Sequence, residues 1–275
     1  MKQNLPTRRI PAAVHLNRGP GLRAARGSEH PLIGLAAGNQ PVRLTPEDGH
    51  LLLVAPAGMG TSTVLRTLGA QHLATGGHLD VLDVHLDQQA WARGLDRVAY
   101  LDTAEAIAVH LHGLAHQARR RAEAGRPGPR RLVLVEDCGT TDVLLHHHLD
   151  ARPNGTPLDA LTAVLAHGRL AGMQVALACQ AIPPALAHIT ADLFTTRLLI
   201  APDEDTWQRA GSPADTRPPP GSSRPGLWHH CTAAGARQVR AARLDEDAAT
   251  AWAADPTPSR SGRLPAARTT KESDR

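Results

Sequence analysis

The sequence predicts an α/β fold built on a mostly parallel sheet with helices on both faces. Short apolar runs alternate with helical stretches between residues 45 and 250, and this alternation is typical of parallel strands joined by crossover helices. Hydrophobic residues make up 41% of the 275 residues, which supports a large core, but aromatic residues make up only 2%. The core is therefore expected to consist mainly of Leu, Val, Ala and Ile side chains.

Six apolar runs are predicted to form strands, and four other segments are predicted to form helices. The expected strands span residues 51–55, 79–85, 97–101, 132–135, 174–179 and 197–201. The expected helices span residues 62–75, 103–123, 158–170 and, as a short one, 184–188. Thr103, with Glu105 two residues later, is typical of a helix start. Residues 227–230 and 239–244 are expected to form a C-terminal β-hairpin.

The predicted domain occupies residues 45–256, between two segments of different composition. Residues 1–44 form a basic arm rich in Pro and Gly, which we expect to be mostly irregular, with a short strand near residues 41–44. Residues 257–275 are polar and of mixed charge, and a disordered tail is expected there. Residues 202–224 are rich in Pro and polar side chains, so a long loop is expected.

A glycine-rich segment follows the first of these strands and matches the phosphate-binding pattern G-x-x-x-x-G-K-[ST] with two exceptions. The segment reads LLLVAPAGMGTSTV over residues 51–64. Ala55 stands at the first glycine and Thr61 at the lysine, while Gly60 and Ser62 keep the second glycine and the hydroxyl. Backbone N–H groups at such a turn and at the helix N-terminus behind it can still bind an anion.

The ammonium group that reaches the β- and γ-phosphates is missing from this loop. The chain has only two lysines, Lys2 and Lys271, and both lie in the expected tails. Neither can replace the missing group, so the loop keeps its anion-binding backbone and loses its cation. The candidate nucleotide-binding residues are Ala55, Pro56, Ala57, Gly58, Met59, Gly60, Thr61, Ser62 and Thr63.

Two acidic residues follow the apolar run 132–135, with Glu136 first and Asp137 second. In P-loop ATPases this position supplies an Asp near Mg²⁺ and a residue that orients the attacking water. The order here is reversed, so the carboxylate beside the metal gains a methylene and the one beside the water loses one. Because ångström-scale positioning decides such chemistry, both roles are weakened. The alternative is that the two acids only close a buried strand at a turn.

Polar residues near other strand ends are further candidates. Gln180 follows the run 174–179, and ligands of open α/β sheets bind outside the carboxyl ends of strands. Its amide could sense a γ-phosphate, or it could be an ordinary polar residue at a strand end. Arg169 and Arg197 could act as arginine fingers towards a neighbouring subunit, although such arginines are more often structural.

Composition excludes some classes of protein and leaves others open. The formal net charge of +4 is compatible with binding nucleic acid but does not demand it. Cys138, Cys179 and Cys231 have no paired spacing, which argues against a zinc site or a disulfide framework and fits a reducing cytoplasm. No apolar stretch approaches the ~20 residues of a membrane span, so a cytoplasmic protein without a membrane anchor is expected.

Two clusters outside these motifs have both a structural and a functional interpretation. Residues 119–131, RRRAEAGRPGPRR, are expected to form a solvated loop, with a DNA-facing loop as the alternative. His146 to His148 stand beside Asp150, but consecutive residues point in different directions and make a poor metal cage. A polar turn is the simpler interpretation of the histidines.

The order of these segments resembles the FtsK/SpoIIIE family of DNA translocases, especially its small soluble members. VAPAGMGTST stands where that family has a loop ending in Gly-Lys-Ser, and VLDVH resembles its Asp-Pro-Lys segment, with Asp83 retained and His85 in place of the lysine. LVLVED, HGRLAG with ALACQ, ITADLFTTRLLI and GLWHHCTAAGARQVRAARL follow in the order and with the spacing of that family. The similarity covers residues 45–250.

The resemblance implies a P-loop NTPase fold of the RecA/FtsK type that uses ATP and Mg²⁺ and acts on double-stranded DNA as an oligomer, the hexamer being the form that the family implies. In this class, one other strand separates the strand before the loop from the strand before the acids. The resemblance assigns Mg²⁺ to Ser62 and Glu136. It assigns catalytic roles to Glu136, Asp137, Gln180 and Arg197.

The departures from the family pattern cluster at the nucleotide. They are Ala55, Thr61, His85 and the order of Glu136 and Asp137. The leading prediction is therefore a protein that binds ATP and also DNA, with weakened or absent hydrolysis. One alternative is an active ATP-dependent DNA translocase with an unusual loop, and the other is a non-catalytic regulatory or scaffold subunit of an active paralogue. The sequence does not decide whether ATP is hydrolysed, nor does it give the DNA site, the oligomer size, the partner or the process.

Overall fold

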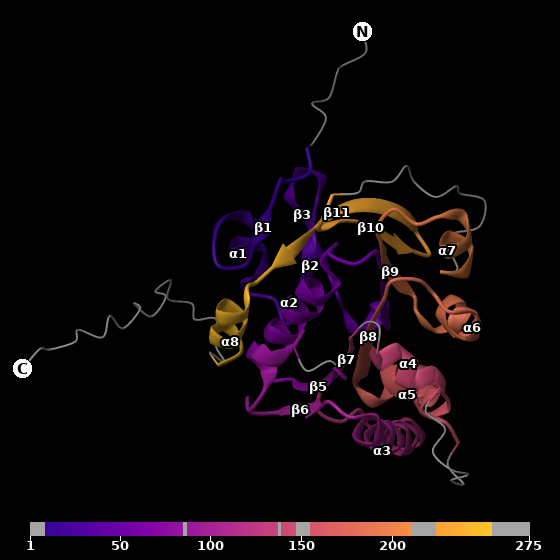
Figure 1. Ribbon diagram of the computed structural model, residues 1–275. Coiled ribbons are helices and arrows are strands. Elements are labelled where there is room, and N and C mark those ends of the chain that lie inside the picture. The colour runs from indigo at the N-terminus through magenta and orange to yellow at the C-terminus, as the bar shows by residue number, and fades with distance from the viewer. Residues whose placement is uncertain (1–8, 85–86, 137–138, 147–154, 211–223, 255–275) are drawn as a thin grey trace, which may run out of the picture.

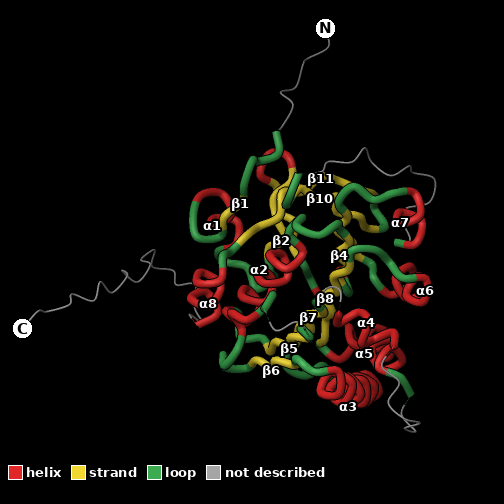
Figure 2. Tube along the Cα trace, viewed as in Figure 1, coloured by secondary structure: helices red, strands yellow, loops and turns green. Residues whose placement is uncertain are grey.

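The chain folds around one mixed sheet that carries helices on both faces (Figures 1 and 2). The computed structural model describes residues 9–84, 87–136, 139–146, 155–210 and 224–254. The strands are β1 Val14–His15, β2 Leu32–Ala36, β3 Gln40–Arg43, β4 Leu51–Val54, β5 His78–Leu82, β6 Val98–Leu101, β7 Arg131–Val135, β8 Met173–Cys179, β9 Thr196–Leu199, β10 Leu227–Thr232 and β11 Gly235–Arg243. The helices are α1 Gly19–Ala25, α2 Thr61–Ala74, α3 Ala104–Glu123, α4 Gly139–His146, α5 Pro157–Ala171, α6 Pro184–Leu193, α7 Glu204–Arg209 and α8 Glu246–Ala254.

The sheet has a parallel half and an antiparallel extension. Its strand order is β3-β2-β11-β10-β9-β4-β8-β7-β5-β6, and β1 pairs with β11. From β9 to β6 every neighbouring pair is parallel. The hairpin of β10 and β11 joins β9 by antiparallel pairing, and β2 and β3 continue the sheet beyond it. The predicted mostly parallel sheet and C-terminal hairpin are therefore confirmed.

Strand β4 shows why the core has two layers of helices. Leu51 and Leu53 belong to the cluster that contains residues of α2 and α8, whereas Leu52 and Val54 belong to the cluster with α3 and α5. Side chains alternate between the faces of a strand, so a strand covered on both sides is a continuous apolar run. This explains why LLLV was recognisable as a buried parallel strand.

Local signals fix the ends of the long helices. Thr103 accepts a hydrogen bond from the Ala106 N–H at the start of α3, as its position predicted. Thr156 and Asp159 form a capping box at the start of α5. Gly172 ends the same helix with a left-handed φ of +76°, where the chain turns directly into β8.

Several expectations for the outer segments are wrong. The arm is not mostly irregular from residue 14 onwards, because it forms β1, α1, β2 and β3, and β3 is the short strand expected near residues 41–44. Leu32, Ile33 and Leu35 are part of the core. The expected loop after residue 202 begins with α7, which buries Trp207, although residues 211–223 lie outside the described residues.

Two more helices differ from the prediction. A polar turn was expected at the histidine cluster, but His146 is the last residue of helix α4. The other two histidines of the cluster lie outside the described residues. Helix α8 packs beside α2 after the hairpin and had not been predicted. The expected tail, 257–275, also lies outside the described part, and the domain boundaries at 45 and 256 stay a prediction. Among the described helices, none combines the length and apolar character that a membrane span requires.

Buried histidines link this fold to pH. The backbone N–H of Val175 donates to His50 Nδ1 over 2.9 Å, so the ring donates from Nε2 to the Leu165 carbonyl over 2.8 Å. Burial lowers the pKa of His50 from 6.5 to about 4. It lowers the pKa of His72 and of His230 to about 4 as well.

We expect the free energy of unfolding to fall as the pH drops from about 6.5 towards 4. In this window the unfolded chain binds protons on these rings and the folded chain does not, so protonation favours unfolding. Each histidine contributes about 2 kcal/mol between about pH 7 and about pH 5. Urea unfolding at both values measures the effect. His50→Asn should lose about 2 kcal/mol less than the wild type over this range, whereas the exposed control His188→Asn should match the wild type. An unchanged pH dependence in His50→Asn would contradict this prediction.

Candidate nucleotide site

The glycine-rich loop lies at the carboxyl end of β4 and leads into α2. The Ala55 N–H donates to the Cys179 carbonyl over 3.2 Å, which fastens the loop to the end of β8. Gly58 and Gly60 have φ values of +78° and +104°, which glycine adopts without strain. These two glycines therefore set the turn even though Ala55 replaces the first glycine of the pattern.

The start of α2 offers backbone donors to an anion. The first N–H groups of a helix have no acceptor within the helix, and the positive end of its dipole lies there. Gly60 is the N-cap and has no side chain to cap these groups. Thr61, Ser62 and Thr63 are all partly exposed, so a phosphate can reach their backbone. The first turn of α2 thus has the geometry that the predicted anion site requires, and anion binding there stays a prediction.

Glu136 lies directly beside the loop. Ser62 Oγ donates to Glu136 Oε1 over 2.8 Å. Strand β8 lies between β4 and β7, so the two motifs follow strands that are separated by one other strand, as expected. Two segments 74 residues apart in the sequence thus meet at one edge of the sheet.

Gln89 completes the surroundings of Glu136. Its Nε2 donates to Glu136 Oε2 over 2.6 Å and to the Ser62 carbonyl over 3.1 Å. Its Oε1 accepts from Trp91 Nε1 over 2.7 Å. Gln89 is fully buried and Glu136 is 2% exposed. The amide therefore holds the carboxylate of β7 against the first turn of α2.

Asp83 holds the backbone of Gln89 in place. Its Oδ2 accepts from the Gln89 N–H over 3.1 Å and from the Tyr100 hydroxyl over 2.7 Å. Burial, followed by the hydrogen bond to Asp83, raises the pKa of Tyr100. Tyr100 therefore stays protonated and keeps donating. Asp83 thus acts through the position of Gln89, whereas His85, two residues on, lies outside the described residues.

Ser62 and Glu136 fit a magnesium ion by their chemistry. Mg²⁺ prefers oxygen ligands and is commonly held by one or two carboxylates together with substrate phosphates. Ser62 Oγ and Glu136 Oε1 are two such oxygens 2.8 Å apart, while Gln89 occupies the other carboxylate oxygen. Asp137, the second predicted acid, lies outside the described residues. Within the described ranges, no group of three or more His, Cys, Asp or Glu could hold a metal by itself.

The other predicted residues divide between the two ends of the sheet. Gln180 follows Cys179 at the carboxyl end of β8, beside the loop. Arg197 is 6% exposed, lies beside Leu52 in the sheet and donates to the Ala191 carbonyl over 2.9 Å. This is a structural contact, so a catalytic role for Arg197 has no support from its surroundings. Arg169 is exposed at the end of α5, near the amino ends of the strands, and faces away from the loop of its own chain.

The arginine-rich segment has both structural and exposed members. Arg130 donates to the carbonyls of Glu29 and Thr75, and Arg131 pairs with Asp80. The remaining contact, Arg121 to the Ala171 carbonyl, also lies within the protein. The exposed arginines of the segment are Arg119, Arg120 and Arg126.

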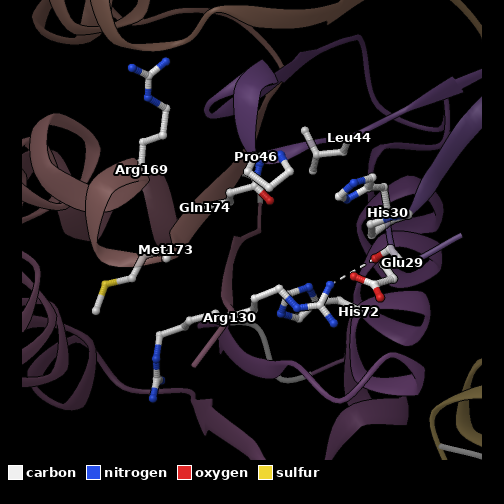
Figure 3. A pocket seen from close by; sticks show the side chains of 12 residues that line it. Glu29, His30, Leu44, Pro46, His72, Arg130, Arg169, Met173 and Gln174 are labelled. Carbon is white, nitrogen blue, oxygen red and sulfur yellow. Dashed lines mark hydrogen bonds between the residues drawn. The ribbon is translucent and has the colours of Figure 1, made fainter. Parts of the chain in front are cut away.

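A cavity lies between the amino ends of β7 and β8, where Figure 3 shows Arg130 and His72 close together. The donors of Arg130 are taken by backbone carbonyls, as the dashed line to Glu29 illustrates. The loop after β4 lies at the opposite edge of the parallel strands. This cavity is therefore separate from the nucleotide site.

The cysteines of the described chain are buried thiols. Cys179 and Cys231 are both free and buried, and burial raises the pKa of Cys231 to about 11. Burial therefore disfavours the reactive thiolate form of Cys231, and Cys138 lies outside the described residues.

No family model matches the sequence, and a search of curated proteins finds no match. Solved structures do match. The pCW3 conjugation coupling protein TcpA, determined with ATPgS, has a TM-score of 0.67 and 13% identity, over 87% of this chain and 72% of that one. The cytoplasmic domain of the type VII secretion ATPase EccC from Thermomonospora curvata has a TM-score of 0.61 and 16% identity, over 86% of this chain and 29% of that one.

A third structure agrees with these two. EssC (ATPases 2 and 3) from Geobacillus thermodenitrificans has a TM-score of 0.63 and 15% identity, over 93% of this chain and 52% of that one. The chain thus has the fold of FtsK/SpoIIIE-type P-loop ATPases, as the resemblance implied. It spans about half of EssC and under a third of EccC, so the likeness concerns one ATPase fold within longer proteins.

Sequence reasoning missed Gln89. The segment between β5 and β6 carries no motif that marks a glutamine as a partner of Glu136. The available signal was topological, because the residues that follow β5 must lie at the same sheet edge as those that follow β4 and β7.

We expect Gln89→Leu to lower the free energy of unfolding by about 2 kcal/mol or more, because it leaves Glu136 Oε2 and Trp91 Nε1 buried without this partner. The neighbouring Gln88 is exposed and bonds only to Asp87 among the described contacts. Gln88→Leu should therefore change stability by less than about 0.5 kcal/mol. Urea unfolding of both variants measures the difference. Equal effects would show that Gln89 does not hold the site together.

Proposed function

We propose that this protein binds ATP or a related nucleotide at residues 55–63 and hydrolyses it slowly or not at all. The observation that supports this most is the Ser62–Glu136 hydrogen bond in a loop whose lysine is replaced by Thr61. The glycine turn and the Ser62–Glu136 pair support binding of phosphates and Mg²⁺, while Thr61 brings no cation to face the transferred phosphate. The site is therefore suited to binding more than to catalysis.

The expected loss of hydrolysis rate follows from electrostatics. A hydrolysing site stabilises the charge that develops on the phosphate oxygens, and a single missing donor costs on the order of 10²–10³ in rate. A bound Mg²⁺ held by Ser62 and Glu136 would supply part of that charge. The hydroxyl of Thr61 can donate a hydrogen bond but carries no charge. Binding depends less on this group, because the N–H groups of α2 act on the nucleotide in its ground state.

An active DNA translocase remains the second candidate. It is supported by the preserved Ser62–Glu136 geometry and by the fold shared with TcpA, a conjugation coupling protein. A cytoplasmic location, oligomer formation and DNA binding are part of both this candidate and the leading proposal. A scaffold subunit that docks onto an active paralogue requires the nucleotide site only as a structural element.

We expect ATP hydrolysis close to background, with or without duplex DNA. Thr61→Lys should raise nucleotide affinity more than rate, because Gln89 still holds Glu136 and the acids keep their reversed order. Phosphate release and equilibrium binding measured on the same samples separate the two effects. A wild-type turnover of several per second that Ser62→Ala abolishes would contradict the proposed weak hydrolysis and favour the active translocase.

If the protein binds DNA through the arginine-rich segment, Arg119, Arg120 and Arg126 should carry the contacts, since they are exposed. Replacing all three by Gln should flatten the slope of log affinity against log salt by about 0.9 per lost phosphate contact. Arg23, Arg26 and Arg237 are exposed elsewhere, and their replacement changes the net charge equally. Fluorescence anisotropy with a labelled duplex measures both slopes. Equal slopes in the two triple variants would return the segment to the solvated-loop interpretation, and no binding at low salt would favour the scaffold.

A further inference from the structure

The phosphate-binding loop borders a cleft that the sequence motif does not include. The cleft has a volume of about 250 Å³. Gly58, Gly60 and Thr63 line one side of it, and Arg240 and Arg243 of β11 line the other. The cleft therefore places basic residues from the end of the chain beside the loop that lacks its own.

Backbone hydrogen bonds hold the two sides of this cleft together. The Gly226 N–H donates to the Met59 carbonyl over 3.0 Å, which ties the start of the hairpin to the loop. The Ala241 N–H donates to the Gly226 carbonyl over 2.9 Å, which carries the connection to the strand that bears Arg240. The position of Arg240 relative to the loop is thus fixed by the main chain.

Arg240 carries a charge that the described structure leaves without an acidic partner. Its Nη1 donates to the Pro225 carbonyl over 2.8 Å, and its Nε is buried without a hydrogen-bond partner. Among the described residues, the ion pairs include neither Arg240 nor Arg243. Arg243 instead contacts His15 through Nη2 over 2.9 Å.

The charges of Arg224 and Arg243 add to the positive potential around Arg240. Burial lowers the pKa of Arg240, and the charges of Arg224 and Arg243 lower it further. His15 has a lowered pKa for the same reasons, namely burial and the charges of Arg243 and Arg18, against which Asp245 acts weakly. Guanidinium groups stay charged at neutral pH, so the cluster attracts an anion.

The walls of the cleft suit the other end of a nucleotide. Met59, Val64, Val14 and Pro225 are apolar and face the same space as the arginines. Ligand sites in proteins combine such apolar walls with a few polar groups that fix orientation. A base and a ribose fit the apolar walls of the cleft, and phosphates fit its arginines.

We propose that Arg240 supplies, from β11, the positive charge towards a bound nucleoside di- or triphosphate that Thr61 cannot supply from the loop. This inference rests on the proposed nucleotide binding. Arg240 reaches the site from β11, whereas the lysine position of the P-loop pattern, Thr61, is the first residue of α2, so Arg240 offsets the charge of the bound phosphates without taking the position of the lysine. It is a binding residue and lowers the dissociation constant without restoring hydrolysis.

The test measures ADP and ATP affinity by calorimetry at low salt, with and without Mg²⁺. Arg240→Gln should weaken the binding of both nucleotides about tenfold or more, the effect of losing one charge-assisted contact. Arg237 lies on the same strand, is exposed and does not line the cleft. Arg237→Gln removes the same charge and should change affinity less than about twofold, because exposed charges at a distance are screened.

Two rescue variants separate charge from folding. Arg240→Lys keeps the charge and should bind within a few-fold of the wild type, and Thr61→Lys combined with Arg240→Gln should regain most of the lost affinity. Thermal unfolding of each variant confirms that it is folded.

Equal affinity in Arg240→Gln and the wild type overturns the inference and leaves the proposed function standing. Failure of both rescues in folded protein also overturns it, because the loss would then not be one of charge. If the wild type binds neither nucleotide, the proposed function itself fails.

Discussion

The pairing of β4 with both of its neighbours is the constraint on which the site depends. Val54 lies beside Cys179 of β8 on one side and Leu199 of β9 on the other. All four residues of the strand are buried, with both faces covered by helices. The chain must therefore turn at Ala55, one strand away from Glu136. The core fixes this place, and no step requires a lysine, which explains how the loop keeps its position with Thr61 at the lysine site.

The same constraint gives Glu136 a structural role. A carboxylate that is 2% exposed needs hydrogen bonds to remain charged. Ser62 and Gln89 provide them, and Asp83 holds Gln89 in place. The side chains of Ser62 and Gln89 are neutral, so these two contacts stabilise the carboxylate by hydrogen bonding and not by opposite charge. Glu136 therefore joins the end of β7 to the first turn of α2 whether or not the site hydrolyses a nucleotide.

The sequence was informative where local patterns decide structure. Apolar runs marked β4, β7 and β8, and Thr103 marked the start of α3, because burial on both faces and helix capping are visible within a few residues. Strand β2 pairs locally with β3, but its other partner, β11, lies about 200 residues later in the chain, so its place inside the sheet was not visible from nearby residues. Gln89 and Arg240 were missed for the same reason: each matters through a residue on another strand. Thus the loop was predictable, whereas Gln89 and Arg240 could be recognised beside it only from the tertiary fold.

The location of Arg240 affects whether a bound nucleotide would change the affinity, the hydrolysis rate or the stability of the protein. A cation that contacts phosphates in the ground state improves binding without favouring the transition state, so it tightens affinity and leaves the rate unchanged. The binding energy would then stabilise the folded chain, and the stabilisation would rise with the logarithm of nucleotide concentration above the dissociation constant. The affected contacts include the bond between Gly226 and Met59, which joins the antiparallel hairpin to the parallel half of the sheet. A nucleotide bound in this cleft would stabilise the contact between the hairpin and the parallel half of the sheet. This effect does not require hydrolysis. Any binding surface formed by both halves would respond to it.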